Sequence, residues 1–320
     1  MAEMMHNLYL EVTNACVHAC VTCPHGTHNR ITVPYFTPVD ILCGTVETAM
    51  REKHVRSVTL SGGEPLMHPD IMEISARLSQ MGVQITMLSN LQLLAERNIG
   101  EALYHAAPHM TIVTALHSAD PAPHDMVTRH PGSHAAAVRS IDVLVSLRIN
   151  VILKVILSVS TCYRLKGIMA FAYERWGNAV RFNLCGLDLC GADADTIRAT
   201  PVDYALEGKI IEEALDSAEK RYGELLPRYV NITEYPLCYI DPYFWKLFSI
   251  RRNSSHMTAY IKENSFHTAD RLREESTCDV HAIACSDCVA ETICPGFWHS
   301  VYRIQGEKCV RPYKRERNHQ

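Results

Sequence analysis

A regular alternation of short apolar runs and amphipathic segments across residues 8–186 most restricts how this chain can fold. Six runs have the length and apolar character of strands, and segments with helical spacing and helix-end signals separate them. Such an alternation predicts a parallel sheet with right-handed crossovers. The expected strands are Leu8–Thr13, Ser57–Leu60, Gln84–Leu88, Met110–Leu116, Asn150–Ser158 and Ala179–Leu184, and the expected helices are 37–51, 70–81, 91–107, 134–148 and 163–176.

The pattern changes after Gly186. A polar loop over 187–201 precedes an acidic amphipathic helix over 202–222, and from Tyr229 onward the chain reads as irregular, with many aromatic residues and cysteines. Periodicity alone fits either an open doubly wound sheet or a barrel. We expect three parts: an α/β core over 1–195, a bridging helix and strand over 196–236, and a small cysteine-rich domain over 237–320.

Three cysteines follow the first expected strand in a C-x3-C-x2-C pattern: Cys16, Cys20 and Cys23. Three thiolates on one loop can bind three irons of a [4Fe–4S] cube and leave the fourth iron open to another ligand. A zinc site is the alternative, with His18, His25 or His28 as the fourth ligand.

The second expected strand ends in Ser61-Gly62-Gly63-Glu64-Pro65. Glycines at a strand end let the backbone approach a ligand closely and adopt conformations closed to other residues. A carboxylate at this position can accept hydrogen bonds from an ammonium group. Taken alone, this motif is also compatible with an ordinary turn.

Together, the cysteine triplet and the Gly-Gly-Glu motif resemble the radical S-adenosylmethionine (radical SAM) superfamily. The resemblance implies a partial (β/α)6 TIM-type barrel, a [4Fe–4S] cluster, and S-adenosylmethionine chelated to the open iron. It implies that Gly62, Gly63 and Glu64 bind the methionine ammonium. Val21 and Thr22 stand where the family commonly has an aromatic residue that stacks on adenine.

The resemblance also implies cofactor contacts from polar residues on later strands. Residues at the ends of the third and fourth strands would contact the ribose and the methionine carboxylate, and charged residues in the fifth and sixth strands would point into the barrel lumen. The alternative for each is a structural polar group whose hydrogen bonds are satisfied within the protein. These candidates are Ser89, Asn90, His117, Ser118, Lys154 and Arg181.

A second group of cysteines lies near the C-terminus, as Cys285-x2-Cys288-x5-Cys294 with Cys238 upstream. Four thiolates can bind zinc or a second [4Fe–4S] cluster. The segment resembles the SPASM extension of radical SAM enzymes or its shorter relative, twitch. Trp298 stands where SPASM expects a further cysteine, which implies one auxiliary cluster. Cys278 and Cys309 are possible substitute ligands.

The resemblance implies an enzyme that cleaves S-adenosylmethionine reductively and uses the 5′-deoxyadenosyl radical to abstract a substrate hydrogen. Epimerisation, oxidation or cross-linking would follow, with Cys278 as a candidate hydrogen donor. We expect a ribosomally made peptide as substrate; the alternatives are a small molecule such as an aminoglycoside or sugar, and a non-catalytic cluster- or zinc-binding protein. A one-electron donor such as flavodoxin or ferredoxin would be a partner.

Composition sets limits on location and partners. The formal net charge is −4 and the pI about 6.5, which gives no general preference for nucleic acid or for an anionic membrane. The one basic cluster, Arg311–Arg317, reads as a solvated tail. We find no apolar stretch of about 18–20 residues and no signal peptide, so we expect a cytoplasmic protein. The 13 cysteines then indicate metal binding rather than disulfides.

Overall fold

A computed structural model describes residues 6–23, 33–190, 192, 194–249, 256–262, 265–269 and 278–314. Its main feature is a nine-stranded sheet in the order β7-β6-β5-β4-β3-β2-β1-β8-β9. Every neighbouring pair is parallel except β8 and β9, which form an antiparallel hairpin. The strands are β1 (His6–Thr13), β2 (Val55–Gly62), β3 (Gln84–Leu88), β4 (Thr111–Ala115), β5 (Asn150–Leu157), β6 (Val180–Gly186), β7 (Val230–Thr233), β8 (His256–Lys262) and β9 (Ser265–Ala269).

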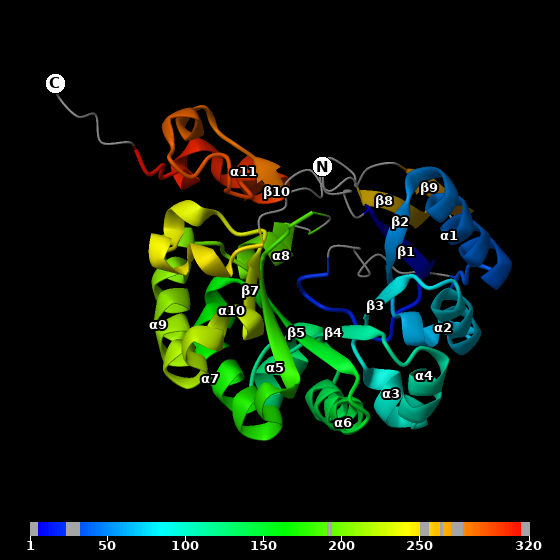
Figure 1. The fold of residues 1–320 in the computed structure, drawn as a ribbon. Helices are drawn as coiled ribbons and strands as arrows, with labels where there is room; N and C mark the ends of the chain where they lie inside the picture. The colour runs from blue at the N-terminus through cyan, green and yellow to red at the C-terminus, as the bar shows by residue number, and fades with distance from the viewer. Residues whose placement is uncertain are drawn as a thin grey trace.

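The sheet curves into a partial barrel with the helices along its outer side (Figure 1). In Figure 1 the segment that follows β1 runs inside this curve, beside the ends of the neighbouring strands. The helices are α1 (Val39–Lys53), α2 (Ile71–Gln80), α3 (Gln92–Arg97), α4 (Gly100–Ala106), α5 (Pro121–Thr128), α6 (Ser133–Ser146), α7 (Val159–Trp176), α8 (Ala194–Ala199), α9 (Tyr204–Tyr222), α10 (Leu226–Tyr229) and α11 (His299–Gln305).

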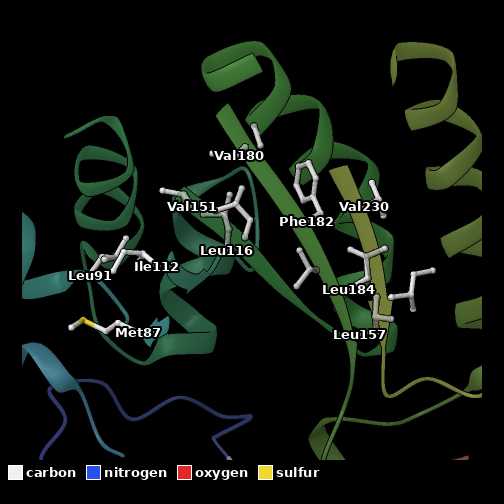
Figure 2. Packing of buried hydrophobic residues seen from close by; sticks show 14 of the residues in the cluster. Met87, Leu91, Ile112, Leu116, Val151, Leu157, Val180, Phe182, Leu184 and Val230 are labelled. Atoms are coloured by element: carbon white, nitrogen blue, oxygen red, sulfur yellow. The ribbon is translucent and has the colours of Figure 1, made fainter. Parts of the chain in front are cut away.

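Alternation along the strands separates an apolar outer face from a more polar inner face. In β5 the residues Val151, Leu153, Val155 and Leu157 are buried, whereas Lys154 lies on the other face and is partly exposed. The buried set packs with residues of neighbouring strands such as Ile112, Phe182 and Val230, as Figure 2 shows. Burying one such side chain contributes about 1.5–3 kcal/mol, so the outer face supplies the core and the inner face remains available for a site.

The partial barrel predicted from sequence is confirmed, and the sheet extends beyond the six predicted strands. β7 adds next to β6, while β8 returns from the C-terminal third to pair with β1. The single helix expected over 91–107 is wrong: it divides into α3 and α4 because Asn98 adopts a left-handed conformation with φ 51°. Helix α5 was not expected from sequence.

The C-terminal region forms a smaller unit beside the end of the barrel (Figure 1). Strands β10 (Cys278–Val280) and β11 (Phe297–Trp298) form a two-stranded antiparallel sheet followed by α11. The three-part division predicted from sequence stays a prediction; β8 and β9 lie within the third predicted part and belong to the main sheet. In the part of the chain that the structure describes, we find no helix long and apolar enough to cross a lipid bilayer.

A close contact joins the outer helix α9 to the segment that carries Cys238. A Cβ atom on Gly208 would lie 2.1 Å from the carbonyl oxygen of Tyr239, so only glycine permits this approach. Gly167, in the middle of α7, has no neighbouring atom within 4 Å of the equivalent position. Gly167 therefore serves as the control for Gly208, since both lie within helices and only Gly208 is closely packed.

We expect Gly208→Ala to lower the midpoint of thermal unfolding by several degrees, because a backbone clash outweighs the gain in helix propensity. Gly167→Ala should raise the midpoint, since alanine is favoured over glycine in a helix by about 1 kcal/mol. Calorimetry on both apo variants measures the two shifts. Equal shifts of the same sign would contradict the packing described for Gly208.

Candidate functional site

The cysteine loop leaves the C-terminal end of β1 and returns beside it. The amide of Asn14 donates to the carbonyl of Tyr35 at 3.3 Å, and that of Thr37 to the carbonyl of Val12 at 3.0 Å. These bonds tie both ends of the loop to the barrel. The candidate zinc ligands His25 and His28 lie outside the described residues.

The three loop thiols lie close enough to affect one another's ionisation. Burial raises the pKa of Cys16 to about 11 and that of Cys20 to about 12, and the neighbouring thiols add to both shifts. Cys20 and Cys23 belong to one turn, in which the amide of Cys23 donates to the carbonyl of Cys20 at 3.2 Å. The side-chain amide of Asn90 donates to the Cys16 sulfur at 3.6 Å. Three convergent thiols fit a cluster that displaces their protons on binding.

Helix α5, which sequence reasoning missed, supports this loop. Its carbonyls at Thr128 and Val127 accept hydrogen bonds from the loop amides of Ala19 (3.1 Å) and Val21 (2.9 Å). The His18 ring also stacks on His130, with the ring centroids 4.8 Å apart. Burial lowers the pKa of His18 to about 4, so its imidazole is neutral at physiological pH.

The Gly-Gly-Glu turn is bound directly to the start of the cysteine loop. The amide of Gly63 donates to the carbonyl of Thr13 at 2.7 Å, and that of Glu64 to the carbonyl of Ala15 at 2.6 Å. Gly62 has φ 113°, and a Cβ atom at Gly62 or Gly63 would lie 2.1 or 2.0 Å from a loop carbonyl oxygen. Both glycines are therefore required by the close approach of two backbones.

Glu64 joins this turn to the end of β3. Its side chain is 1% exposed and accepts from the Ser89 hydroxyl at 2.6 Å, the Asn90 amide at 2.7 Å and the Leu66 amide at 3.1 Å. Burial raises the pKa of Glu64 to about 7 although all three hydrogen bonds favour the carboxylate. The structure thus brings Glu64, Ser89 and Asn90 together beside Cys16.

His117 and Ser118, at the end of β4, are buried and engaged by α5 and the turn before it. The amide of His117 donates to Nδ1 of His124 at 3.2 Å, and the Ser118 hydroxyl accepts from the Asp120 amide at 2.9 Å. Burial lowers the pKa of His117 to about 4. Arg181 lies apart from these residues, exposed at the N-terminal end of β6.

An inner cluster of three side chains forms where β5, β6 and the turn after β7 lie side by side. It consists of Lys154, Cys185 and Glu234. The thiol of Cys185 donates to Oε2 of Glu234 at 2.9 Å, and Lys154 lies beside both, since their charges raise its pKa. Glu234 has φ 57°, and its carbonyl oxygen would lie 1.9 Å from a Cβ atom on Gly186. Sequence reasoning missed Glu234 because a left-handed glutamate leaves no local signal.

Cys278, the candidate hydrogen donor, lies where β10 meets this inner cluster. Burial raises its pKa well above the ordinary value, with Glu234 and Cys185 as further causes, and its thiol contacts the Gly296 carbonyl at 3.5 Å. The indole Nε1 of Trp298 is buried beside Gly186 and has no hydrogen-bond partner among the described residues.

The second group of thiols surrounds an enclosed pocket in the C-terminal unit. Four of its lining residues are the predicted ligands Cys238, Cys285, Cys288 and Cys294. The Gly296 amide donates to the Cys294 sulfur at 3.4 Å, and the Arg311 amide bonds the Cys238 sulfur. Cys278 and Cys309 do not line this pocket.

These four thiols fit a polynuclear cluster. All 13 cysteines are free. Among the described residues, no three His, Cys, Asp or Glu side chains are close enough to hold a single metal ion. A zinc site would need its ligands within about 2.3 Å of one ion. Four thiols that line one pocket supply the ligand set that either zinc or a [4Fe–4S] cluster needs.

Comparison with known proteins finds similarity to one superfamily over part of the chain. Residues 10–161 match the model of the radical SAM superfamily. Two curated relatives are probable GTP 3′,8-cyclases: one from Pyrobaculum aerophilum, 27% identical over 155 residues, and one from Methanocaldococcus jannaschii, 28% identical over 102 residues. The matched stretches span 48% and 33% of those relatives and 46% and 32% of this chain.

Two solved structures share the fold over more of the chain. Streptococcus suis SuiB bound to the precursor peptide SuiA has a TM-score of 0.60 at 15% identity, covering 80% of this chain and 58% of SuiB. HydG, a maturase of the [FeFe]-hydrogenase, has a TM-score of 0.52 at 13% identity, covering 72% of this chain and 52% of HydG. At such identities the likeness establishes the fold.

We propose that Glu64 accepts a charge-assisted hydrogen bond from the methionine ammonium, and on that basis we expect Glu64→Gln to weaken S-adenosylmethionine binding by about tenfold. In the parent protein the ammonium favours the ionised carboxylate. With a pKa of about 7 for Glu64, binding should tighten between pH 6 and pH 8, and the variant should lose this dependence. Calorimetric titration of the anaerobically reconstituted protein measures both effects, with exposed Glu73→Gln as the control. An unchanged affinity and pH profile would contradict the assignment.

Proposed function

We propose that this chain, whose residues 10–161 match the radical SAM model, is a member of that superfamily and modifies a peptide through a substrate radical, with Cys16, Cys20 and Cys23 as cluster ligands. The superfamily uses a [4Fe–4S] cluster and S-adenosylmethionine, which together supply a 5′-deoxyadenosyl radical. The observation that carries the proposal is the bonding of the Gly62–Glu64 turn to the start of the cysteine loop, which brings the carboxylate expected to bind the methionine ammonium close to Cys16.

The chain's own residues position and enclose the reaction. Gly62, Gly63 and Glu64 would bind the methionine end of the cofactor, and Asn90 would orient Cys16. Ser89, His117 and Ser118 would act mainly by shaping this wall, since their side chains or amides already bond within the protein. We assign no cofactor contact to Arg181, given its exposed position at the far end of β6.

The inner cluster supports a role toward the substrate rather than the cofactor. Lys154 could bind a substrate carbonyl or carboxylate, and Cys185 and Cys278 are two thiols within the electrostatic reach of Glu234. A thiol that returns a hydrogen atom gives epimerisation; an electron passed to the auxiliary site gives oxidation or cross-linking.

A peptide is the favoured substrate class. The fold likeness covering 80% of the chain is to SuiB bound to its precursor peptide. Cys278 of the C-terminal unit lies within electrostatic range of Cys185 and Glu234, so the barrel and the C-terminal unit both contribute to one group of polar side chains. An aminoglycoside or sugar remains the alternative from the same enzyme class.

Nucleotide cyclisation is a second candidate, supported by the partial similarity to the probable GTP 3′,8-cyclases. A nucleoside triphosphate carries about four negative charges and is usually bound by several cations. In the inner cluster Lys154 is accompanied by the carboxylates of Glu234 and Asp188. This charge balance favours the peptide.

We further propose an auxiliary [4Fe–4S] cluster on Cys238, Cys285, Cys288 and Cys294. Anaerobic reconstitution should give about eight irons per chain, from two cubes. Cys285→Ala/Cys288→Ala should reduce this to about four and leave S-adenosylmethionine cleavage measurable, while Cys190→Ala is the control outside both ligand sets. A count of about four in the parent protein would remove the auxiliary cluster.

The substrate class is tested by product formation under reducing, anaerobic conditions. Peptides encoded beside the gene should raise 5′-deoxyadenosine formation at least about tenfold over the uncoupled rate, and GTP should not. In deuterated water, gain of one deuteron at carbon indicates hydrogen return by a thiol, whereas loss of two mass units indicates oxidation. A cyclised product from GTP would overturn the peptide proposal. Undiminished cleavage of S-adenosylmethionine by the variant Cys16→Ala/Cys20→Ala/Cys23→Ala would overturn the cluster assignment.

A further inference from the structure

We propose that the basic segment Arg311–Lys314, with Lys209 of α9, forms a docking surface for an acidic one-electron carrier protein that exchanges electrons with the auxiliary site at Cys238. The inference rests on the auxiliary cluster of the proposed function. It replaces the solvated tail expected from sequence for the first part of the basic cluster.

Two neighbouring pockets share Cys238 as a common wall. The inner pocket is enclosed by the four thiols, and Cys238 is one of them. The outer pocket, of about 260 Å³, is lined by Lys209, Tyr239, Arg311 and Tyr313 together with Cys238. Cys238 thus contacts the cluster position on one side and the molecular surface on the other. A partner seated at the outer pocket would have only this ligand between itself and the cluster position.

The basic segment is fixed to the cluster ligands by its backbone. The amide of Arg311 bonds the Cys238 sulfur, and the Tyr313 carbonyl accepts from the Val289 amide at 2.8 Å. Lys314 then forms an isolated antiparallel bridge with Cys288. The segment therefore follows the outer side of the auxiliary site and does not extend freely into solvent over these residues.

The side chains on this fixed backbone point their charge outward. Arg311 and Lys314 are exposed, and the Arg311 guanidinium lies 5.5 Å from the centre of the Tyr239 ring. No ion pair joins either cation to a carboxylate within the part of the chain that the structure describes. Such cations on a rigid segment can meet an anionic partner without first breaking an internal salt bridge.

The acidic residues of the outer pocket are used by the protein itself. Glu212 accepts from the Asp241 amide at 2.6 Å, and Asp241 accepts from the Tyr243 amide at 2.8 Å. Among the described residues at and beside the outer pocket, the three cations Lys209, Arg311 and Lys314 outnumber the two carboxylates Glu212 and Asp241, on a chain of net charge −4. A local positive surface on an otherwise acidic protein steers an anionic partner to one place.

The location of this surface identifies the kind of partner. Nucleic acid or an anionic membrane would use charge alone and would have no need of contact with a metal ligand. Here two of the cations, Lys209 and Arg311, line the pocket that contains Cys238, and the backbone of the basic segment pairs with Cys238 and Cys288. A small acidic flavin or iron–sulfur protein fits both the charge and the exposed ligand.

The charge-reversal variant Arg311→Glu/Lys314→Glu tests the surface in the reconstituted enzyme. The control is Arg303→Glu/Lys308→Glu, which reverses two exposed cations elsewhere on the same unit. We expect the dissociation constant for flavodoxin or ferredoxin to rise about tenfold in the test variant, with weaker salt dependence, and to change less than about twofold in the control. Stopped-flow absorbance should show the same loss in the rate of cluster reduction by the reduced carrier, and no change in the rate with dithionite.

An unchanged affinity for the carrier, or an equal loss with dithionite, would overturn the docking surface. So would binding of the parent protein to phosphatidylserine vesicles or duplex DNA that the charge reversal abolishes while carrier binding is retained. The iron count separates this outcome from failure of the proposed function. About eight irons with unaffected carrier binding rejects only the surface, whereas about four irons rejects the auxiliary cluster beneath it.

Discussion

The site depends on one close contact between two backbones, the end of β1 and the end of β2. The amides of Gly63 and Glu64 bind carbonyls at the start of the cysteine loop, at separations that leave no space for a Cβ atom on Gly62 or Gly63. Because Glu64 also binds the end of β3, three adjacent strands converge on one carboxylate. The loop, the turn and the buried carboxylate are therefore positioned by hydrogen bonds of the main chain, which any rearrangement would break together.

Much of the fold could be predicted because the strands alternate apolar and polar residues and end at recognisable turns. β3 is found at the predicted residues, Gln84–Leu88, since Gly82 and Ser89 mark its ends clearly. The split between α3 and α4 was missed although Asn98 stands at the division, since asparagine tolerates the left-handed conformation but does not require it. β8 was missed for a similar reason: its pairing partner, β1, lies some 250 residues earlier in the chain.

The candidate site was predictable where chemistry is concentrated in a short motif. The two cysteine groups and the Gly-Gly-Glu turn need particular residue types at fixed spacing, and the structure brings each group together. The inner cluster could not be found in this way. Cys185 and Glu234 are far apart in sequence, and only the adjacency of β6 and β7 brings the thiol to the carboxylate. Arg181 was expected to point into the barrel lumen because it belongs to the sixth strand, and it lies exposed at the N-terminal end of β6. Strand membership alone does not say at which end of the strand a residue lies.

The pairing of β8 with β1 has a consequence for how the chain is made. β1 lies between β2 and β8, so one edge of β1 stays open until residues 256–262, some 250 residues later in the chain, leave the ribosome. An unpaired parallel edge is open to wrong partners during that interval. The edge of β1 is thereby covered late, and three of the four auxiliary cysteines, Cys285, Cys288 and Cys294, follow β8 in the chain. Synthesis thus finishes the sheet before it supplies the last of the thiols.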